Sequence, residues 1–177
     1  MYDIPDQYYD GKKLEDGSIV CVDKDVLEVV IRKEGTEHGQ YRLCHANGAL
    51  KQEGYYCHGV LQGTISSFSE EGVLLAKSVF DNGKQQGEAW QYYASGELYS
   101  IRRYNDGKLE GKQEYYYSDG TIKTVMHHNK GLLHGIVTLY RADGKPEREM
   151  HFDDGVKKGV ERRWNDEGSP TEELDGK

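Results

Sequence analysis

Aromatic and aliphatic side chains recur along this chain with a period of 24 residues. One recurring position carries Cys44, Phe68, Tyr92, Tyr116, Tyr140 and Trp164. A second carries Leu50, Leu74, Leu98, Ile122, Pro146 and Pro170, and a third carries Tyr56, Phe80, Tyr104, His128 and Phe152. The runs between turn residues are about seven residues long, which is a normal strand length. A period of this size is typical of solenoids and other repeat arrays.

Glycine marks the same period in three interleaved series. The series are Gly48, Gly72, Gly96, Gly120, Gly144, Gly168; then Gly11, Gly35, Gly59, Gly83, Gly107, Gly131, Gly155; then Gly39, Gly63, Gly87, Gly111, Gly135, Gly159. Pairs such as Asn47-Gly48 and Asn82-Gly83 tolerate the positive φ that tight hairpin turns require. A helix would have to accept a glycine every few residues, at about 1 kcal/mol each, and no 3.6-residue period is present. Each unit is therefore predicted to be a β-hairpin.

Hairpins joined by such short links should lie side by side. The predicted fold is all-β: a single elongated, twisted antiparallel sheet of tandem β-hairpins with roughly 10–13 strands. Residues one period apart then lie two strands apart, at about 9.6 Å. The aromatic position from Phe68 to Trp164 should form a ladder on one face, with the leucine side chains between its rings. This ladder should provide the apolar burial that a single hairpin lacks.

The two ends of the chain depart from the pattern. Residues 1–34 are predicted to form a degenerate capping hairpin, with strands over 18–22 and 26–32, because terminal repeats are usually atypical. Residues 35–168 should form five repeats. Residues 169–177 should be a tail that frays from about Thr171. The open edges of the sheet could also pair between chains into a homo-oligomer.

Composition narrows the classes of partner. Leu, Ile, Val and Phe make up only about a fifth of the chain, but the 14 Tyr and 22 Gly stand at fixed intervals, which favours folded repeats over disorder. The net charge of -8 is the wrong sign for nucleic acid or an anionic membrane surface, and it suits a basic protein partner. No leader peptide or apolar run of about 18 residues is seen, and Cys21, Cys44 and Cys57 do not suggest a disulfide framework. A cytoplasmic location is expected.

The repeat resembles the MORN repeat in its shorter bacterial variant. The core G-x4-aromatic-x3-G-x-L is clearest over 87–98 and 111–122, and the likeness covers about 35–168. The resemblance implies an antiparallel sheet of hairpins that serves as a docking scaffold. Similar bacterial proteins are antitoxins or immunity proteins, and eukaryotic relatives are linked to membranes and phosphoinositides. A peripheral lipid-binding module is therefore the alternative function.

Candidate metal ligands do not converge in this fold. Cys44-His45, Cys57-His58 and the nearby His38 are the tightest grouping. The predicted pairing puts Cys44 mid-strand and His58 in a turn at the far end of the next strand, and no C-x2-C spacing is present. His127 and His151 share a column, too far apart for one metal, and His128 should pack in an aromatic position. We expect no metal, no cofactor and no catalytic residues.

Tyrosines beyond the ladder are the candidate site. Tyr93, Tyr115 and Tyr117 adjoin ladder residues, so alternation should direct them to the opposite face. Tyr99 and Tyr55 are expected on that same face. Tyr99 follows Leu98 and Tyr55 precedes Tyr56, so alternation separates each from its neighbour. Exposed tyrosines are favoured at protein interfaces. The sequence thus predicts a non-catalytic scaffold of the antitoxin or immunity type, which binds a partner protein, such as a basic toxin, through Tyr55, Tyr93, Tyr99, Tyr115 and Tyr117.

Overall fold

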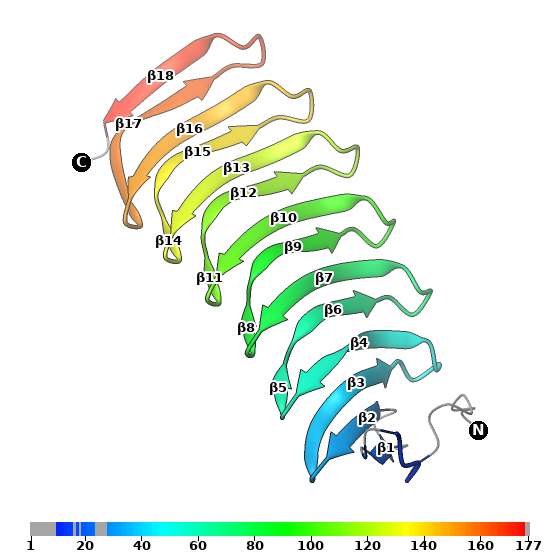
Figure 1. The fold of residues 1–177 in the computed structure, drawn as a ribbon. Helices are drawn as coiled ribbons and strands as arrows, with labels where there is room; N and C mark the ends of the chain where they lie inside the picture. The colour runs from blue at the N-terminus through cyan, green and yellow to red at the C-terminus, as the bar shows by residue number, and fades with distance from the viewer. Residues whose placement is uncertain (1–9, 16, 18, 24–27, 176–177) are drawn as a thin grey trace. The chain divides into compact units, whose positions relative to one another are not determined.

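The protein is all-β in the computed structural model, which describes residues 10–15, 17, 19–23 and 28–175. The chain divides into two compact units, Met1–Gln85 and Gln86–Lys177. In each unit, strands adjacent in sequence pair antiparallel through short turns (Figure 1). The predicted architecture of tandem β-hairpins in open antiparallel sheet is confirmed. None of the described residues belongs to a helix long and apolar enough to cross a membrane.

The N-terminal unit contains eight strands among its described residues. They are β1 (Ile19–Asp23), β2 (Glu28–Lys33), β3 (Thr36–Cys44), β4 (Leu50–Cys57), β5 (Val60–Leu61), β6 (Gly63–Phe68), β7 (Leu74–Asp81) and β8 (Lys84–Gln85). Strands β1 and β2 pair with each other from Ile19↔Arg32 to Asp23↔Glu28, close to the expected capping hairpin. Its connection, residues 24–27, lies outside the described residues.

The C-terminal unit continues the same pattern. Its strands are β9 (Gly87–Tyr92), β10 (Leu98–Asn105), β11 (Lys108–Leu109), β12 (Gly111–Tyr116), β13 (Ile122–Asn129), β14 (Leu132–Leu133), β15 (Gly135–Tyr140), β16 (Pro146–Asp153), β17 (Val156–Trp164) and β18 (Pro170–Asp175). Strand β18 pairs with β17 up to Val160↔Asp175, although fraying was expected from about Thr171. Backbone pairing extends the strand because a β-ladder needs no apolar side chain.

Two kinds of turn alternate along each unit. At one kind, both central residues have positive φ, as in Asn82 (48°) and Gly83 (76°), which is the type I′ geometry. At the other kind, only the glycine has positive φ, and the Gly72 amide donates to the Ser69 carbonyl at 3.0 Å. The first glycine series therefore closes a longer turn than the second, and both kinds reverse the chain as predicted.

The third glycine series marks a β-bulge within a strand. Strand β4 pairs first with the short β5 (Tyr56↔Leu61) and then, in shifted register, with β6 (Glu53↔Ser66). The shift falls at Gln62 and Gly63, where Gly63 has a φ of 75°. The bulge places two extra residues in this strand, because four residues separate Leu61 from Ser66 but only two separate Tyr56 from Glu53. Glycine accepts the left-handed backbone there. The short and long strands are thus one interrupted strand of the repeat.

The buried core lies at a position that the sequence analysis did not single out. The residue two places after each third-series glycine is buried in every repeat: Tyr41, Ile65, Ala89, Gln113, Val137 and Glu161. Their cross-strand partners include Gly54 for Tyr41 and Met150 for Val137. This core position, rather than the aromatic ladder, is the one that is buried in all six repeats.

The aromatic ladder differs from the prediction in two respects. Its members, such as Phe68 and Tyr116, are only half-buried. The leucine position does not fill gaps between aromatic residues, because each member pairs directly across the hairpin, as in Phe68↔Leu74 and Tyr116↔Ile122. The cause is the longer turn, which brings the two positions opposite each other where the register shifts.

Candidate interaction surface

Three tyrosines of the C-terminal unit form a row of edge-on rings. Tyr93 directly follows β9, Tyr99 lies on β10 and Tyr115 on β12. The Tyr93 and Tyr99 ring centroids are 5.2 Å apart, those of Tyr99 and Tyr115 are 5.8 Å apart, and both pairs are inclined at 74°. Aromatic rings prefer such edge-to-face contacts. The structure therefore brings together three of the five tyrosines that the sequence singled out.

A bulge in β10 positions the middle ring of this row. Tyr115 pairs across the strands with Ser100. Between Leu98 and Ser100 the register with β9 shifts, so Tyr99 is the extra residue. Simple alternation from Ser100 would direct Tyr99 to the other side of the sheet. The bulge removes that constraint, and Tyr99 contacts both Tyr93 and Tyr115.

Hydroxyl groups at the edge of the row tie neighbouring repeats together. The Tyr93 hydroxyl donates to the Tyr116 carbonyl at 2.7 Å, and the Tyr117 hydroxyl donates to the Tyr140 carbonyl at 2.8 Å. The same position in the next repeat is Arg141, whose guanidinium donates to the Trp164 carbonyl. These side chains reach the ladder residue 23 positions ahead. Tyr93 and Tyr117 therefore have a structural role that the sequence analysis missed.

Cationic side chains lie beside the tyrosines. The Lys123 ammonium is 5.4 Å from the centre of the Tyr117 ring, and the Arg102 guanidinium is 5.9 Å from that of Tyr104. Burial raises the pKa of Tyr115, while the charge of Arg102 opposes that rise. Tyr115 therefore stays a neutral hydrogen-bond donor at physiological pH.

Tyr55 does not share the side of the sheet that the prediction gave it. In its own unit, Tyr56 is in ring contact with the core residue Tyr41 at 5.0 Å. Tyr55 pairs with Gln40 and makes an edge contact with His38 at 6.2 Å, on the other side. The error arose from assigning Tyr56 to the ladder face; the repeat places it with the core residue. Tyr55 is 40% exposed.

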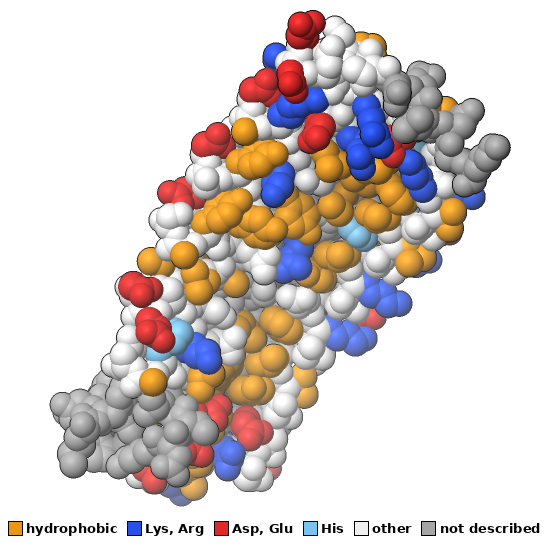
Figure 2. Space-filling model, turned by 180° about the vertical axis from the view of Figure 1, so that it is seen from behind, with side chains coloured by type: hydrophobic (Ala, Val, Ile, Leu, Met, Phe, Trp, Pro, Cys, Tyr) orange, Lys and Arg blue, Asp and Glu red, His pale blue; other side chains and the backbone are white. Residues whose placement is uncertain are grey.

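Acidic turns flank the tyrosine row. Glu97, Asp119 and Asp143 lie in the longer turns and are exposed. Hydrogen bonds lower the pKa of each carboxyl: Ser95 provides the largest effect at Glu97, and the backbone amides of Thr121 and Lys145 do so at Asp119 and Asp143. All three are charged at neutral pH. Seen from behind, the C-terminal unit in the upper half of Figure 2 carries a band of hydrophobic side chains with acidic ones along one margin.

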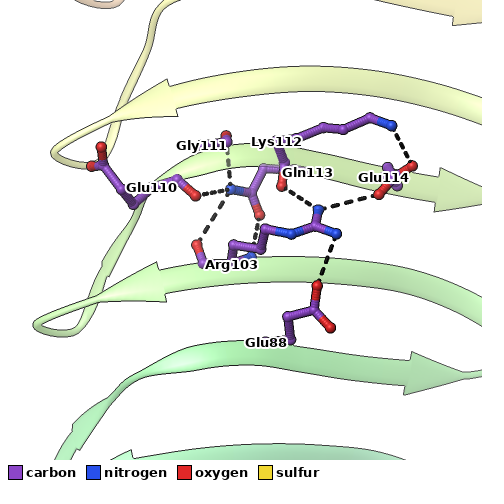
Figure 3. A network of polar contacts seen from close by, with 7 residues as sticks. All are labelled: Glu88, Arg103, Glu110, Gly111, Lys112, Gln113 and Glu114. Atoms are coloured by element: carbon purple, nitrogen blue, oxygen red, sulfur yellow. Dashed lines mark hydrogen bonds and ion pairs between the residues drawn. The ribbon is translucent and has the colours of Figure 1, made fainter.

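A polar network supports the strands that carry the row (Figure 3). Gln113 is 0% exposed; its side-chain oxygen accepts the Arg103 amide at 2.8 Å, and its NH2 group donates to the carbonyls of Arg103, Glu110 and Gly111 at 3.1–3.3 Å. The Arg103 guanidinium pairs with Glu88 at 2.9 Å and with Glu114 at 3.1 Å. The network therefore joins β9, β10 and β12 across the bulge at Gly111.

Glu161 occupies the core position of the last repeat as a charged group. Its carboxylate pairs with Arg148 at 3.0 Å, with Arg163 at 2.7 Å and with Lys157. The hydrogen bond from Lys157, followed by that from Arg163, lowers the pKa of Glu161 to about 2. Three cations thus neutralise a carboxylate at the position that holds Ile65, Ala89 and Val137 in three other repeats, in keeping with the cost of burying an unpaired charge.

Histidine and cysteine side chains converge where the sequence predicted no site. His38, Cys57 and His58 have ligand-type atoms that all lie within 4.8 Å of one another. Cys44 is the last residue of β3 and pairs with Leu50 near the opposite turn, whereas it was expected mid-strand. Pairing within single hairpins could not predict this group, because it forms between residues 20 positions apart that meet at a type I′ turn, such as His38 and His58. His134, Asp153 and Asp154 form the equivalent group in the C-terminal unit.

The remaining histidines lie as expected. His127 and His151 are exposed, and His128 is half-buried. Burial lowers the pKa of His128, and the charge of His127 lowers it further. His128 pairs with Gly111 and with Leu133, so it packs against its own hairpins.

Comparison with known families agrees with this architecture. Residues 109–130 and 133–154 each match the family model described as MORN repeat variant. These two stretches of the C-terminal unit are MORN-type repeats. No curated protein matches the chain. Each matched stretch contains one long hairpin, β12–β13 or β15–β16, and the longer turn that closes it. MORN repeats are binding modules and are not a known enzyme family.

Proposed function

We propose that this protein is a non-catalytic scaffold of the antitoxin or immunity type that binds a basic protein partner. The observation that carries the proposal is the row of tyrosine rings Tyr93, Tyr99 and Tyr115. Repeats held by the network of Gln113 would present this row on rigid strands, and tyrosine provides a large contact area at low entropic cost. Binding of a partner would cover the row and occlude the partner's own surface.

Charge supports a basic partner. The net charge is -8, and the turns beside the row carry the ionised carboxylates of Glu97, Asp119 and Asp143. Complementary fields accelerate encounter and discriminate against partners of the same sign. The affinity should therefore weaken as salt is raised. An anionic membrane would be repelled by the same charges, so the lipid-binding alternative receives no support from them.

The test truncates Tyr99 and Tyr115 of the row and keeps the hydrogen bonds that join neighbouring repeats. In Tyr99→Ser/Tyr115→Ser, the Tyr93 hydroxyl bond to Tyr116 remains, and circular dichroism with thermal unfolding checks the fold. Calorimetry would then measure binding to the purified product of the neighbouring gene. We expect the double variant to lose about 2 kcal/mol or more of binding free energy, as for interface hot spots. Tyr55→Ser, on the other side of its own unit, is the matched control and should bind like the wild type.

Two results would refute the proposal. Equal affinity of the wild type and Tyr99→Ser/Tyr115→Ser would show that the row is not the interface. Flotation of the wild type with anionic vesicles, together with no binding to proteins captured from the native cells, would assign the lipid-binding function instead. Suppression of the partner's toxicity on co-expression, lost in the double variant, would support the antitoxin role.

A further inference from the structure

We propose that His38, Cys57 and His58 form a binding site for a Zn²⁺ ion at the type I′ turn of the β4–β5 hairpin. The three ligand-type atoms lie within 4.8 Å of one another, and the Cys57 Sγ is already 3.3 Å from the His58 Nδ1. The rings of His38 and His58 have centroids 4.9 Å apart. Ligands bound tetrahedrally at 2.0–2.3 Å from zinc are separated by about 3.3–3.8 Å. The group therefore needs a contraction of about 1.5 Å at most.

The repeat itself explains why three side chains meet here. At three type I′ turns, the residue before a third-series glycine accepts a hydrogen bond from the amide 20 positions ahead. The donor–acceptor distances are 2.9 Å for Asn82 to Gln62, 2.9 Å for Asp106 to Gln86 and 2.8 Å for Lys130 to Glu110. The architecture therefore brings three side chains together whatever their chemistry.

The turn at His58 departs from this arrangement in a way that points to a ligand. The equivalent bond, from the His58 amide to the His38 Nδ1, is 3.4 Å long, so it is the weakest of the set. Elsewhere the three positions hold mostly amide and carboxylate residues, such as Gln62, Asp81 and Asn82, with Lys130 and His134 as the exceptions. Here all three hold transition-metal ligands. Having His38, Cys57 and His58 at these positions weakens the hydrogen bond of the turn and brings a thiol and two imidazoles together.

The donor set selects the class of metal. A thiolate with two imidazoles suits zinc, whereas Mg²⁺ and Ca²⁺ prefer oxygen ligands. Three protein ligands leave a fourth position for water. Zinc binding would remove the thiol proton of Cys57, which passes to solvent or buffer, and would displace the long bond between the His58 amide and the His38 Nδ1. The group His134, Asp153 and Asp154 has two carboxylates in place of these ligands and should bind zinc less tightly.

The experiment uses the untagged full chain, freed of metal and reduced. Zn²⁺ would be titrated in competition with a chromophoric chelator, and Co²⁺ would be added separately to detect thiolate-to-cobalt charge-transfer absorption. We expect one tight equivalent of Zn²⁺ and a charge-transfer band. Cys57→Ser should abolish the band and weaken zinc binding at least about tenfold. The matched control Cys44→Ser should leave both unchanged.

A second variant separates metal binding from folding. His38→Gln/Cys57→Asp/His58→Asn copies the residues at Gln62, Asp81 and Asn82, so it should restore a strong turn bond and fold. It should also lose the tight zinc equivalent and the protection against thermal unfolding that zinc provides. No tight equivalent in the wild type would overturn the proposal. So would zinc binding that survives in the triple variant or disappears in His134→Asn.

Discussion

Gly54 and Tyr41 offer the sharpest test of the core described above. A Cβ atom at residue 54 would lie 2.5 Å from the Tyr41 Cε1 and 3.1 Å from its Cζ and hydroxyl oxygen. Tyr41 is buried, and its hydroxyl donates to Gln52 at 3.0 Å, so the ring has little freedom to move. Gly54→Ala should therefore overpack the site and cost about 1–3 kcal/mol of unfolding free energy.

The neighbouring repeat provides the rescue. There the corresponding pair is Ile65 opposite Ser78. Ile65 is smaller than Tyr41, and Ser78 is larger than Gly54. Tyr41→Ile alone should leave a cavity, but Tyr41→Ile/Gly54→Ser copies the neighbouring pair. We expect the double variant to be more stable than the sum of the single changes by about 0.5–3 kcal/mol.

Urea unfolding followed by circular dichroism measures the effect. With a slope of about 2 kcal/mol per molar urea, a loss of about 2 kcal/mol lowers the midpoint by about 1 M. Ser78→Ala is the control and should change the midpoint little, since Ile65 does not crowd that position. A wild-type midpoint for Gly54→Ala, or strictly additive effects in the double variant, would refute this view of the core.

Three further predictions address the polar contacts. Gln113→Leu should destabilise the protein by about 1–3 kcal/mol in urea unfolding, because the buried backbone groups around it lose their partners; unchanged stability would contradict the network. Tyr93→Phe should lower the free energy of unfolding by about 0.5–1.5 kcal/mol through loss of the hydrogen bond to Tyr116. A crystal structure of this variant should show the row of rings unchanged. Because the pKa of Glu161 is lowered to about 2, its contribution to stability is complete above pH 4.5 and is lost as the pH falls through 4.5 toward 2. Glu161→Gln should lack this acid dependence in thermal unfolding, and an identical pH profile would exclude the effect.

Much of the fold follows from the sequence alone. Glycine at fixed intervals determines where the chain can adopt positive φ, as at Gly83, and that requirement is local to the backbone. The hairpins, their length and the capping strands were therefore predictable. Adjacency of Tyr115 and Tyr116 likewise predicted that their side chains separate, since alternation is a property of a single strand.

Which side of the sheet is buried was decided only by tertiary structure. The register shifts by one residue between Leu43 and Cys44, so counting from the ladder gave Tyr55 the wrong side. The bulge between Leu98 and Ser100 hid why Tyr99 joins the row. The convergence of His38 with His58 likewise depends on pairing between neighbouring hairpins. The need for positive φ concerns only the residues of the turn itself. Burial and convergence depend on partners 20 or more positions away, and a shift of one residue in register reverses the face that a side chain occupies.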